Sequence, residues 1–232
     1  LQVAPYSDFD IVVAASASPS GSKTAGRYGV GLLSIAATDP IGIDLLSTHW
    51  GILEHESAAH GTTVCRDKWR LMGPMHIAET EEQARENCKF GLQWIFDYLS
   101  HIIPVGEEPL PTDYDELVTL LNESGRAVIG TPATARAQIQ RLIDKSGGFG
   151  TYLMLGADFA NWPATLRHYE LFAEEVMPYF NGQMAPTRAA YDKIMGAGSV
   201  YVDATMNSQV ASMMSYQQER ADAGSQWRIP GT

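Results

Sequence analysis

The chain has 232 residues, of which 45% are hydrophobic and 19% charged, and its formal net charge is −11. This length suffices for one sizeable core, or for one domain with an extension. A negative field of this size repels nucleic acid and anionic membrane surfaces, so we expect neither as a partner. No run of about 18 apolar residues is present, so the sequence predicts no membrane-spanning helix.

Strand and helix patterns alternate through the first 182 residues. Apolar, β-branched stretches typical of parallel strands covered on both faces occur at 9–15, 30–37, 69–78 and 151–155. Apolar residues at helical spacing predict helices over 19–28, 41–59, 80–102, 113–123, 132–146 and 162–180. This order predicts an α/β fold with a parallel sheet and right-handed crossovers.

Local signals refine some of these elements. Pro74 lies inside the third strand and has no N–H for the ladder, so we expect irregular pairing there. Thr80 and Gln83 fit a capping box, in which the Gln83 side chain reaches back to the N-cap. Thr131, followed by proline, predicts another helix start.

Residues 183–232 are polar and show little periodicity. We expect them to form a C-terminal extension with helices near 187–195 and 199–220. The sequence therefore predicts two parts, residues 1–182 and residues 183–232.

The chain contains two cysteines, Cys65 and Cys88, too few for a disulfide framework in a chain of this length. Cys88 lies on an apolar stripe, which indicates a buried free thiol. No secretory leader pattern opens the chain, so we expect a cytoplasmic protein. The first residue is Leu1 rather than methionine, so we expect the sequence to begin inside a longer gene product.

The turn at residues 16–21 carries the strongest functional signal. The first strand runs into this hydroxyl-rich turn, and a helix rich in small residues follows it. The amides of Ala17 and Ser18 and the hydroxyls of Ser18 and Ser20 could bind a phosphate at the positive end of the helix dipole. Gly21 would let the phosphate oxygens approach the backbone. An ordinary serine-capped turn would show the same pattern.

Two nucleotide-binding motifs are incomplete in this region. A P-loop requires glycine, four residues, and then Gly-Lys-Ser/Thr. Here Ser22 separates Gly21 from Lys23, and Ser16 stands where the first glycine belongs. The glycines at 26, 29 and 31 precede a strand instead of following one, so they are not a dinucleotide fingerprint.

No metal site is expected. His55 and His60 lie five residues apart, which puts their rings about 140° apart around a helix. A zinc-binding helix needs histidines at i and i+4.

His76, near the end of the third strand, is a weak catalytic candidate, although a lone histidine on a strand is more often structural. Asp158, Asn161 and Trp162 follow the fourth strand, at the end where α/β barrels bind ligands. They are weak candidates for a substrate pocket. Asp158 or Asn161 could equally cap the last helix.

Several stretches together resemble the C-terminal half of the bacterial-luciferase-like flavin-dependent monooxygenases, in particular their limonene-monooxygenase-like branch. The resemblance covers about residues 8–182. The stretches are V-A-A-S-A-S-P-S-G-S-K-T-A-G-R-Y-G-V-G-L-L-S, D-K-W-R-L-M-G-P-M-H-I-A-E-T-E-E-Q-A-R-E-N, V-I-G-T-P, G-G-F-G-T-Y-L-M-L-G-A-D-F-A-N-W and Y-E-L-F-A-E-E-V-M-P-Y-F.

The resemblance implies a TIM barrel in which the four strands here are the fifth to eighth. It implies reduced FMN supplied by a flavin reductase, O₂, and a small apolar organic substrate, with a deazaflavin-dependent oxidoreductase as the alternative. The phosphate would bind at Ala17 and Ser18, with Ser20 and Gly21 beside them. A homo-oligomer is expected.

The sequence departs from the family in length. A (β/α)₈ barrel takes about 250 residues and closes only with eight strands. The first four strands have no counterpart here, so we expect an N-terminal half-barrel from another polypeptide or protomer, or a longer parent protein. A catalytically inactive fragment or a flavin-binding protein is the remaining alternative.

Overall fold

The computed structural model describes residues 9–102, 109–182 and 185–224. The chain divides into two compact units, Leu1–Phe180 and Asn181–Thr232. The strands lie in the first unit, and the second contains helices.

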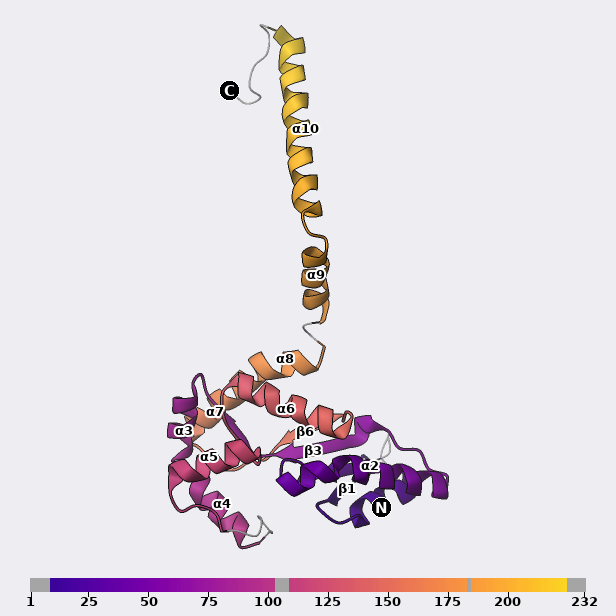
Figure 1. Cartoon of the computed structure of the whole chain (residues 1–232), viewed down its shortest axis with the longest axis vertical. Helices are drawn as coiled ribbons and strands as arrows, with labels where there is room; N and C mark the ends of the chain where they lie inside the picture. The colour runs from indigo at the N-terminus through magenta and orange to yellow at the C-terminus, as the bar shows by residue number, and fades with distance from the viewer. Residues whose placement is uncertain (1–8, 103–108, 183–184, 225–232) are drawn as a thin grey trace. The chain divides into compact units, whose positions relative to one another are not determined.

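A four-stranded parallel sheet is the centre of the first unit (Figure 1). Its strands follow the order β1 (Val12–Ala15), β2 (Gly31–Ser34), β3 (Trp69–Gly73) and β6 (Thr151–Met154). A second parallel pair joins β4 (Met75–Ile77) to β5 (Val128–Gly130). The predicted parallel α/β fold is confirmed, and the described residues form no closed barrel.

The third predicted strand is two strands. β3 and β4 are separated by Pro74, which cannot donate to a ladder. The carbonyl of Pro74 instead accepts from the N–H of Val128, 3.2 Å away, at the start of β5. β5 itself was not predicted, because a strand of three residues shows no recognisable period.

Helices connect and cover these strands (Figure 1). The first unit contains α1 (Ser20–Tyr28), α2 (Pro40–His60), η1 (Arg66–Lys68), α3 (Glu81–Cys88), α4 (Leu92–Ser100), α5 (Tyr114–Ser124), α6 (Pro132–Ser146), α7 (Trp162–Leu171), η2 (Phe172–Val176) and α8 (Met177–Phe180). The last three correspond to the single helix predicted over 162–180, and η2 is a π-helical turn inside it.

The helix predicted over 80–102 is broken at Gly91. The N–H of Gly91 donates to the carbonyl of Phe159, 3.2 Å away. A Cβ at this position would lie 2.1 Å from the carbonyl oxygen of Asp158. The loop after β6 therefore packs directly on the backbone between α3 and α4, and this long-range contact replaces a continuous helix.

The cap of α3 agrees with the sequence in part. The Gln83 N–H donates to Thr80 Oγ1 at 3.1 Å, so Thr80 is the predicted N-cap. The Gln83 side chain donates to Asn87 Oδ1 at 2.8 Å instead of reaching back to Thr80. The reciprocal half of the predicted capping box is therefore wrong. The Thr131 cap is confirmed, and its box is completed by Thr134.

The two faces of the main sheet differ. One face carries Val13, Ala15, Leu32, Trp69, Leu71 and Tyr152, which pack in one core with residues of α1, α2 and α6. We call the other the open face; its residues are Val12, Ala14, Leu33, Arg70, Met72, Thr151 and Leu153. Each of these is partly or largely exposed. Parallel sheets are normally covered on both faces, so the open face is suited to contact something beyond the described helices.

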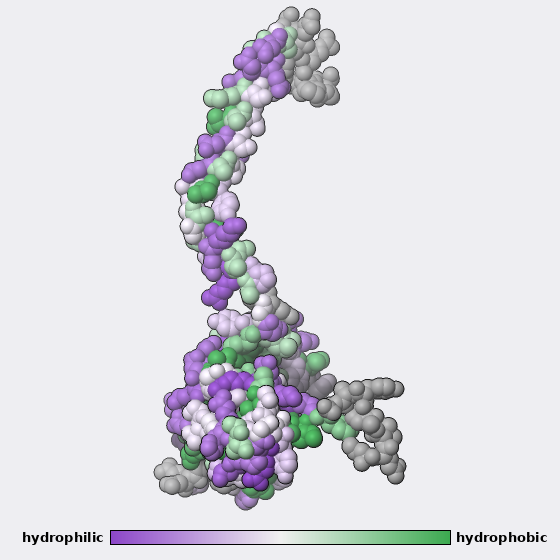
Figure 2. Space-filling view, turned by 90° about the vertical axis from the view of Figure 1, so that its right-hand side faces the viewer, coloured by the Kyte–Doolittle hydropathy of each residue, from purple (hydrophilic) through white to green (hydrophobic). Residues whose placement is uncertain are grey.

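The second unit contains α9 (Ala185–Gly196) and α10 (Val200–Ala223), close to the predicted positions. Neither helix contains a buried residue. Hydrophobic residues are scattered among hydrophilic ones along both (Figure 2). Among the described residues, no helix combines the length and the apolar character that crossing a membrane requires.

Candidate phosphate and ligand site

The turn between β1 and α1 presents hydrogen-bond donors at the carboxyl edge of the sheet. α1 begins at Ser20, and its N-cap is Pro19, which makes no side-chain capping hydrogen bond. The Ser18 and Ser20 hydroxyl oxygens lie 2.7 Å apart and are exposed. The first turn of α1 carries no acidic residue. Free first-turn N–H groups, two hydroxyls and the positive end of a helix dipole suit a phosphate.

Gly21 has a packing role in this turn. A Cβ here would lie 2.6 Å from the carbonyl oxygen of Ala14 and 2.7 Å from Cβ of Ala15. Glycine therefore allows α1 to pack directly on β1. The adjoining Ser22 is buried, and its hydroxyl has no hydrogen-bond partner among the described residues. The packing holds the turn against the end of β1, whatever contact Gly21 also makes with a ligand.

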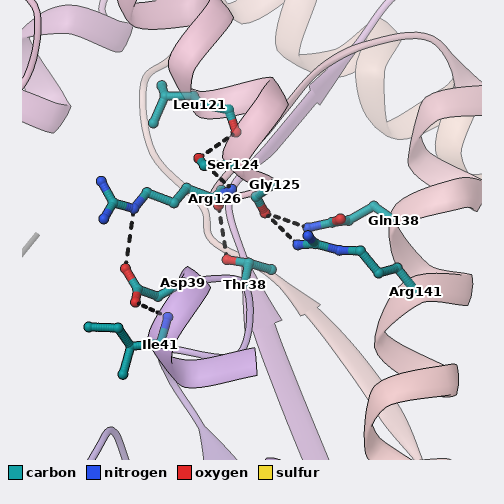
Figure 3. Close-up of polar contacts among 9 residues, drawn as sticks. All are labelled: Thr38, Asp39, Ile41, Leu121, Ser124, Gly125, Arg126, Gln138 and Arg141. Atoms are coloured by element: carbon teal, nitrogen blue, oxygen red, sulfur yellow. Dashed lines mark hydrogen bonds and ion pairs between the residues drawn. The ribbon is translucent and has the colours of Figure 1, made fainter. Parts of the chain in front are cut away.

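The loop after β2 is fixed by a polar cluster at the same edge of the sheet (Figure 3). Thr38 Oγ1 donates to the carbonyl of Arg126 at 2.9 Å, and Arg126 Nε lies 3.2 Å from Asp39 Oδ2. Asp39 Oδ1 also accepts from the Ile41 N–H at 2.9 Å, which caps α2. These contacts join the end of β2 to the connection between α5 and β5.

The same connection is held from its other side by α6 (Figure 3). The carbonyl of Gly125 accepts from Gln138 Nε2 at 2.6 Å and from Arg141 Nη2 at 3.2 Å. These contacts of Arg126 and Gly125 were not predicted from the sequence. The Asp-Pro pair at 39–40 could have revealed the α2 cap, but nothing local indicates the partners across the fold.

His76 lies in a buried pair with His168 of α7. Their ring centroids are 5.3 Å apart. His168 Nδ1 accepts from the Ile77 N–H at 3.1 Å, and His76 Nε2 lies 3.2 Å from Asn87 Nδ2. Burial lowers the pKa of each histidine to about 4. These surroundings, between β4, α3 and α7, favour a neutral structural pair, and a catalytic role for His76 stays a prediction.

The three pocket candidates after β6 have different surroundings. Asn161 is the N-cap of α7, with Oδ1 accepting from the Ala164 N–H at 3.1 Å. Trp162 is 69% exposed, and Asp158 is exposed as well. The capping alternative therefore accounts for Asn161, and a pocket role for the three stays a prediction.

Within the described ranges, no group of three or more His, Cys, Asp or Glu residues is placed to hold a metal ion. Burial raises the pKa of the Cys88 thiol to about 12, as suits a buried free cysteine, whereas Cys65 is exposed. His60 Nδ1 lies 2.9 Å from the carbonyl oxygen of Glu56 in its own helix.

Together these features define an α/β protein with a hydroxyl-rich turn and a helix N-terminus at the carboxyl edge of a parallel sheet. A comparison with protein-family models finds no match. The chain is 46% identical over 221 residues to limonene 1,2-monooxygenase of Rhodococcus erythropolis, covering 95% of this chain and 57% of that protein. It is 29% identical over 197 residues to 4-hydroxyprotoasukamycin monooxygenase of Streptomyces nodosus subsp. asukaensis, covering 82% and 53%.

Solved structures agree on the fold. The oxygenating constituent of 3,6-diketocamphane monooxygenase from Pseudomonas putida, a type II Baeyer-Villiger monooxygenase in complex with FMN, matches with a TM-score of 0.54 and 22% identity. The match covers 73% of this chain and 48% of that one. The chain thus spans about half the length of the proteins it matches. Its curated relatives are limonene 1,2-monooxygenase and other monooxygenases of the luciferase-like family.

Proposed function

We propose that the protein is a flavin-dependent monooxygenase in which this chain seats the phosphate of FMN. Its 46% identity to a limonene 1,2-monooxygenase over 95% of the chain is the observation that carries this proposal. The donor-rich turn before α1 supports it, because its chemistry fits a phosphate.

In the proposed reaction, this chain binds and positions FMN. Ala17 and Ser18 amides, with the Ser18 and Ser20 hydroxyls and Gly21 beside them, would hold the phosphate at the α1 N-terminus. Bound flavin would supply the redox chemistry and the activation of O₂. The contacts between Thr38 and Arg126 and between Asp39 and Arg126 would keep the neighbouring loop rigid.

We further propose that this chain is one half of a TIM barrel. Two observations support this: the open face of the sheet is partly exposed, and the chain spans 57% of the length of limonene 1,2-monooxygenase. The remaining strands, from the rest of a longer protein or from a second polypeptide, would cover the open face below its carboxyl end and complete the cofactor site at that end.

The proposed co-reactants follow from the family. Reduced FMN would come from a separate flavin reductase, O₂ would be the oxidant, and the substrate would be a small apolar organic molecule. The native protein would be a homo-oligomer.

Comparing FMN with riboflavin tests the phosphate seat. The Ser18→Asp variant places a carboxylate against the phosphate and removes a hydroxyl donor. Hydrogen bonds to a charged group contribute roughly 1.5–3 kcal/mol, so FMN affinity should fall by about ten- to a hundredfold. Riboflavin lacks the phosphate, so its affinity should stay the same. Fluorescence titration measures both, with Ser100→Asp at an exposed position on α4 as the control. An equal loss of affinity for FMN and riboflavin would contradict phosphate binding at this turn.

Oxygen uptake separates the alternatives. A monooxygenase consumes O₂ when reduced FMN and substrate are supplied. A deazaflavin-dependent oxidoreductase would transfer hydride with no O₂ uptake. A catalytically inactive flavin-binding protein would bind FMN and show neither reaction.

A further inference from the structure

The carboxyl end of the open face carries a row of apolar residues that belong to none of the sequence motifs described above. Met72 of β3 pairs directly with Leu153 of β6. On the other side of β3, Ser34 pairs with Leu71, so Ile35 comes next to Met72. The N–H of Ile35 donates to the carbonyl of Ala15 at 2.9 Å, so the pairing of β2 with β1 continues to this level.

The row extends from the phosphate seat. Ala15 pairs with Ser34, so the next residue, Ser16, stands beside Ile35. Ser16 is also the first residue of the turn that presents the phosphate donors. Adjacent strands lie about 4.8 Å apart, so Met72 is two strands, or roughly 10 Å, from Ser16. A molecule placed beyond the phosphate along this edge would lie over Met72 and Leu153.

The chemistry of the row is apolar. Ile35 is 40% exposed, and Met72 and Leu153 are partly exposed. These three carry no charge, whereas the next row inward holds Arg70, which is paired with Asp10. Side chains alternate between faces along a strand, so Met72 points away from the helices that cover Leu71. Methionine is flexible and polarisable and adapts to irregular apolar shapes.

We propose that Ile35, Met72 and Leu153 form the wall that contacts the apolar substrate, and that Met72, at the centre of the row, determines the size of substrate accepted. The inference rests on the proposed function and deepens it. An apolar wall distinguishes substrates only by how well they fit. A difference of one methylene group between two substrates therefore changes the preference between them by about 10–200-fold. Met72 and Leu153 lie on strands and Ile35 directly follows β2, whereas Asn161 is engaged in a cap and Trp162 is largely exposed.

The test measures binding without turnover. The native protein, loaded with oxidised FMN, is equilibrated with limonene or with a larger cyclic sesquiterpene, and free ligand is measured in the headspace. Met72→Ala enlarges the site, so the preference for the sesquiterpene over limonene should rise by about tenfold. Met72→Phe should shift it the other way, and the volume-conserving Met72→Leu should bind both ligands as the wild type does.

Met154 provides a matched control. It is the next residue after Leu153 and faces the core between the sheet and α6. Met154→Ala should lower the melting temperature and leave the ligand preference unchanged. FMN affinity is measured first for every variant, and the Met72 variants should retain it within about threefold.

The outcomes distinguish failure of the proposed substrate wall from failure of the proposed monooxygenase function. Normal FMN binding with an unchanged preference in Met72→Ala and Met72→Phe overturns the inference alone. Lower melting temperatures with an unchanged preference also overturn it, because the row would then be covered by protein. Failure of the wild type to bind FMN overturns the proposed function, and the inference with it.

Discussion

At the scale of single residues, burial determines the protonation of His76 and His168. Both rings are enclosed between β4, α3 and α7, and burial lowers their pKa from about 6.5 to about 4. The charge of one ring would also lower the pKa of the other. No carboxylate hydrogen-bonds to either ring among the described residues. The folded protein therefore keeps both neutral across the physiological range.

This pair predicts acid sensitivity. Between pH 6.5 and 4 the unfolded chain binds protons at these histidines and the folded chain does not. The free energy of unfolding should therefore fall as pH falls through this window, by up to about 1.4 kcal/mol per pH unit for each histidine. The stability contributed by the neutral histidine pair is fully present above pH 6.5 and is lost as the pH falls toward 4.

Urea denaturation at several pH values checks this prediction. In a His76→Gln/His168→Asn variant the amide side chains can still hydrogen-bond but do not titrate. The slope of the free energy of unfolding against pH should therefore flatten. His55→Gln, at an exposed position on α2, should leave the slope unchanged. A double variant with the wild-type slope would show that other groups cause the acid sensitivity.

At the scale of elements, the sequence predicted what local chemistry determines. Thr80 and Thr131 cap helices where expected. The succession of β1, a hydroxyl-rich turn and α1 was recognisable for the same reason, since the three segments are contiguous. Features that depend on distant partners were missed. The Thr38 hydrogen bond joins residues 88 positions apart, and no local pattern indicates its partner.

The break at Gly91 is the clearest case of a tertiary contact overriding a local pattern, and it can be tested. Gly91→Ala places a methyl group against the Asp158 carbonyl oxygen, 2.1 Å from the Cβ position. It should destabilise the protein by about 1–3 kcal/mol, as overpacking does. Gly51→Ala in α2 is the matched control, because nothing lies within 4 Å of its Cβ position. There alanine should stabilise by roughly 0.5–1 kcal/mol. Denaturant unfolding measures both, and equal effects would mean that Gly91 is not a packing site.

At the scale of the whole molecule, the open face unites the fold and the proposed function. Its lower rows contain Ala14, Leu33 and Arg70, and one nitrogen of the Arg70 guanidinium is buried without a hydrogen-bond partner among the described residues. Exposing an apolar sheet face to water and burying a donor without an acceptor both cost free energy. A covering layer of strands and side chains would bury the apolar residues and supply an acceptor.

An open face that lacks its covering strands predicts complementation. The 232-residue chain produced alone should bind the dye ANS through its open face. Production together with the part of R. erythropolis limonene 1,2-monooxygenase outside the matched region should lower dye fluorescence and raise FMN affinity. Leu33→Asp should prevent both changes, because an unpaired carboxylate buried in an apolar layer costs at least about 2 kcal/mol. Tyr28→Asp, at a 69% exposed position, should not prevent them. If the chain alone binds FMN tightly and excludes the dye, the open face is not an interface with missing strands.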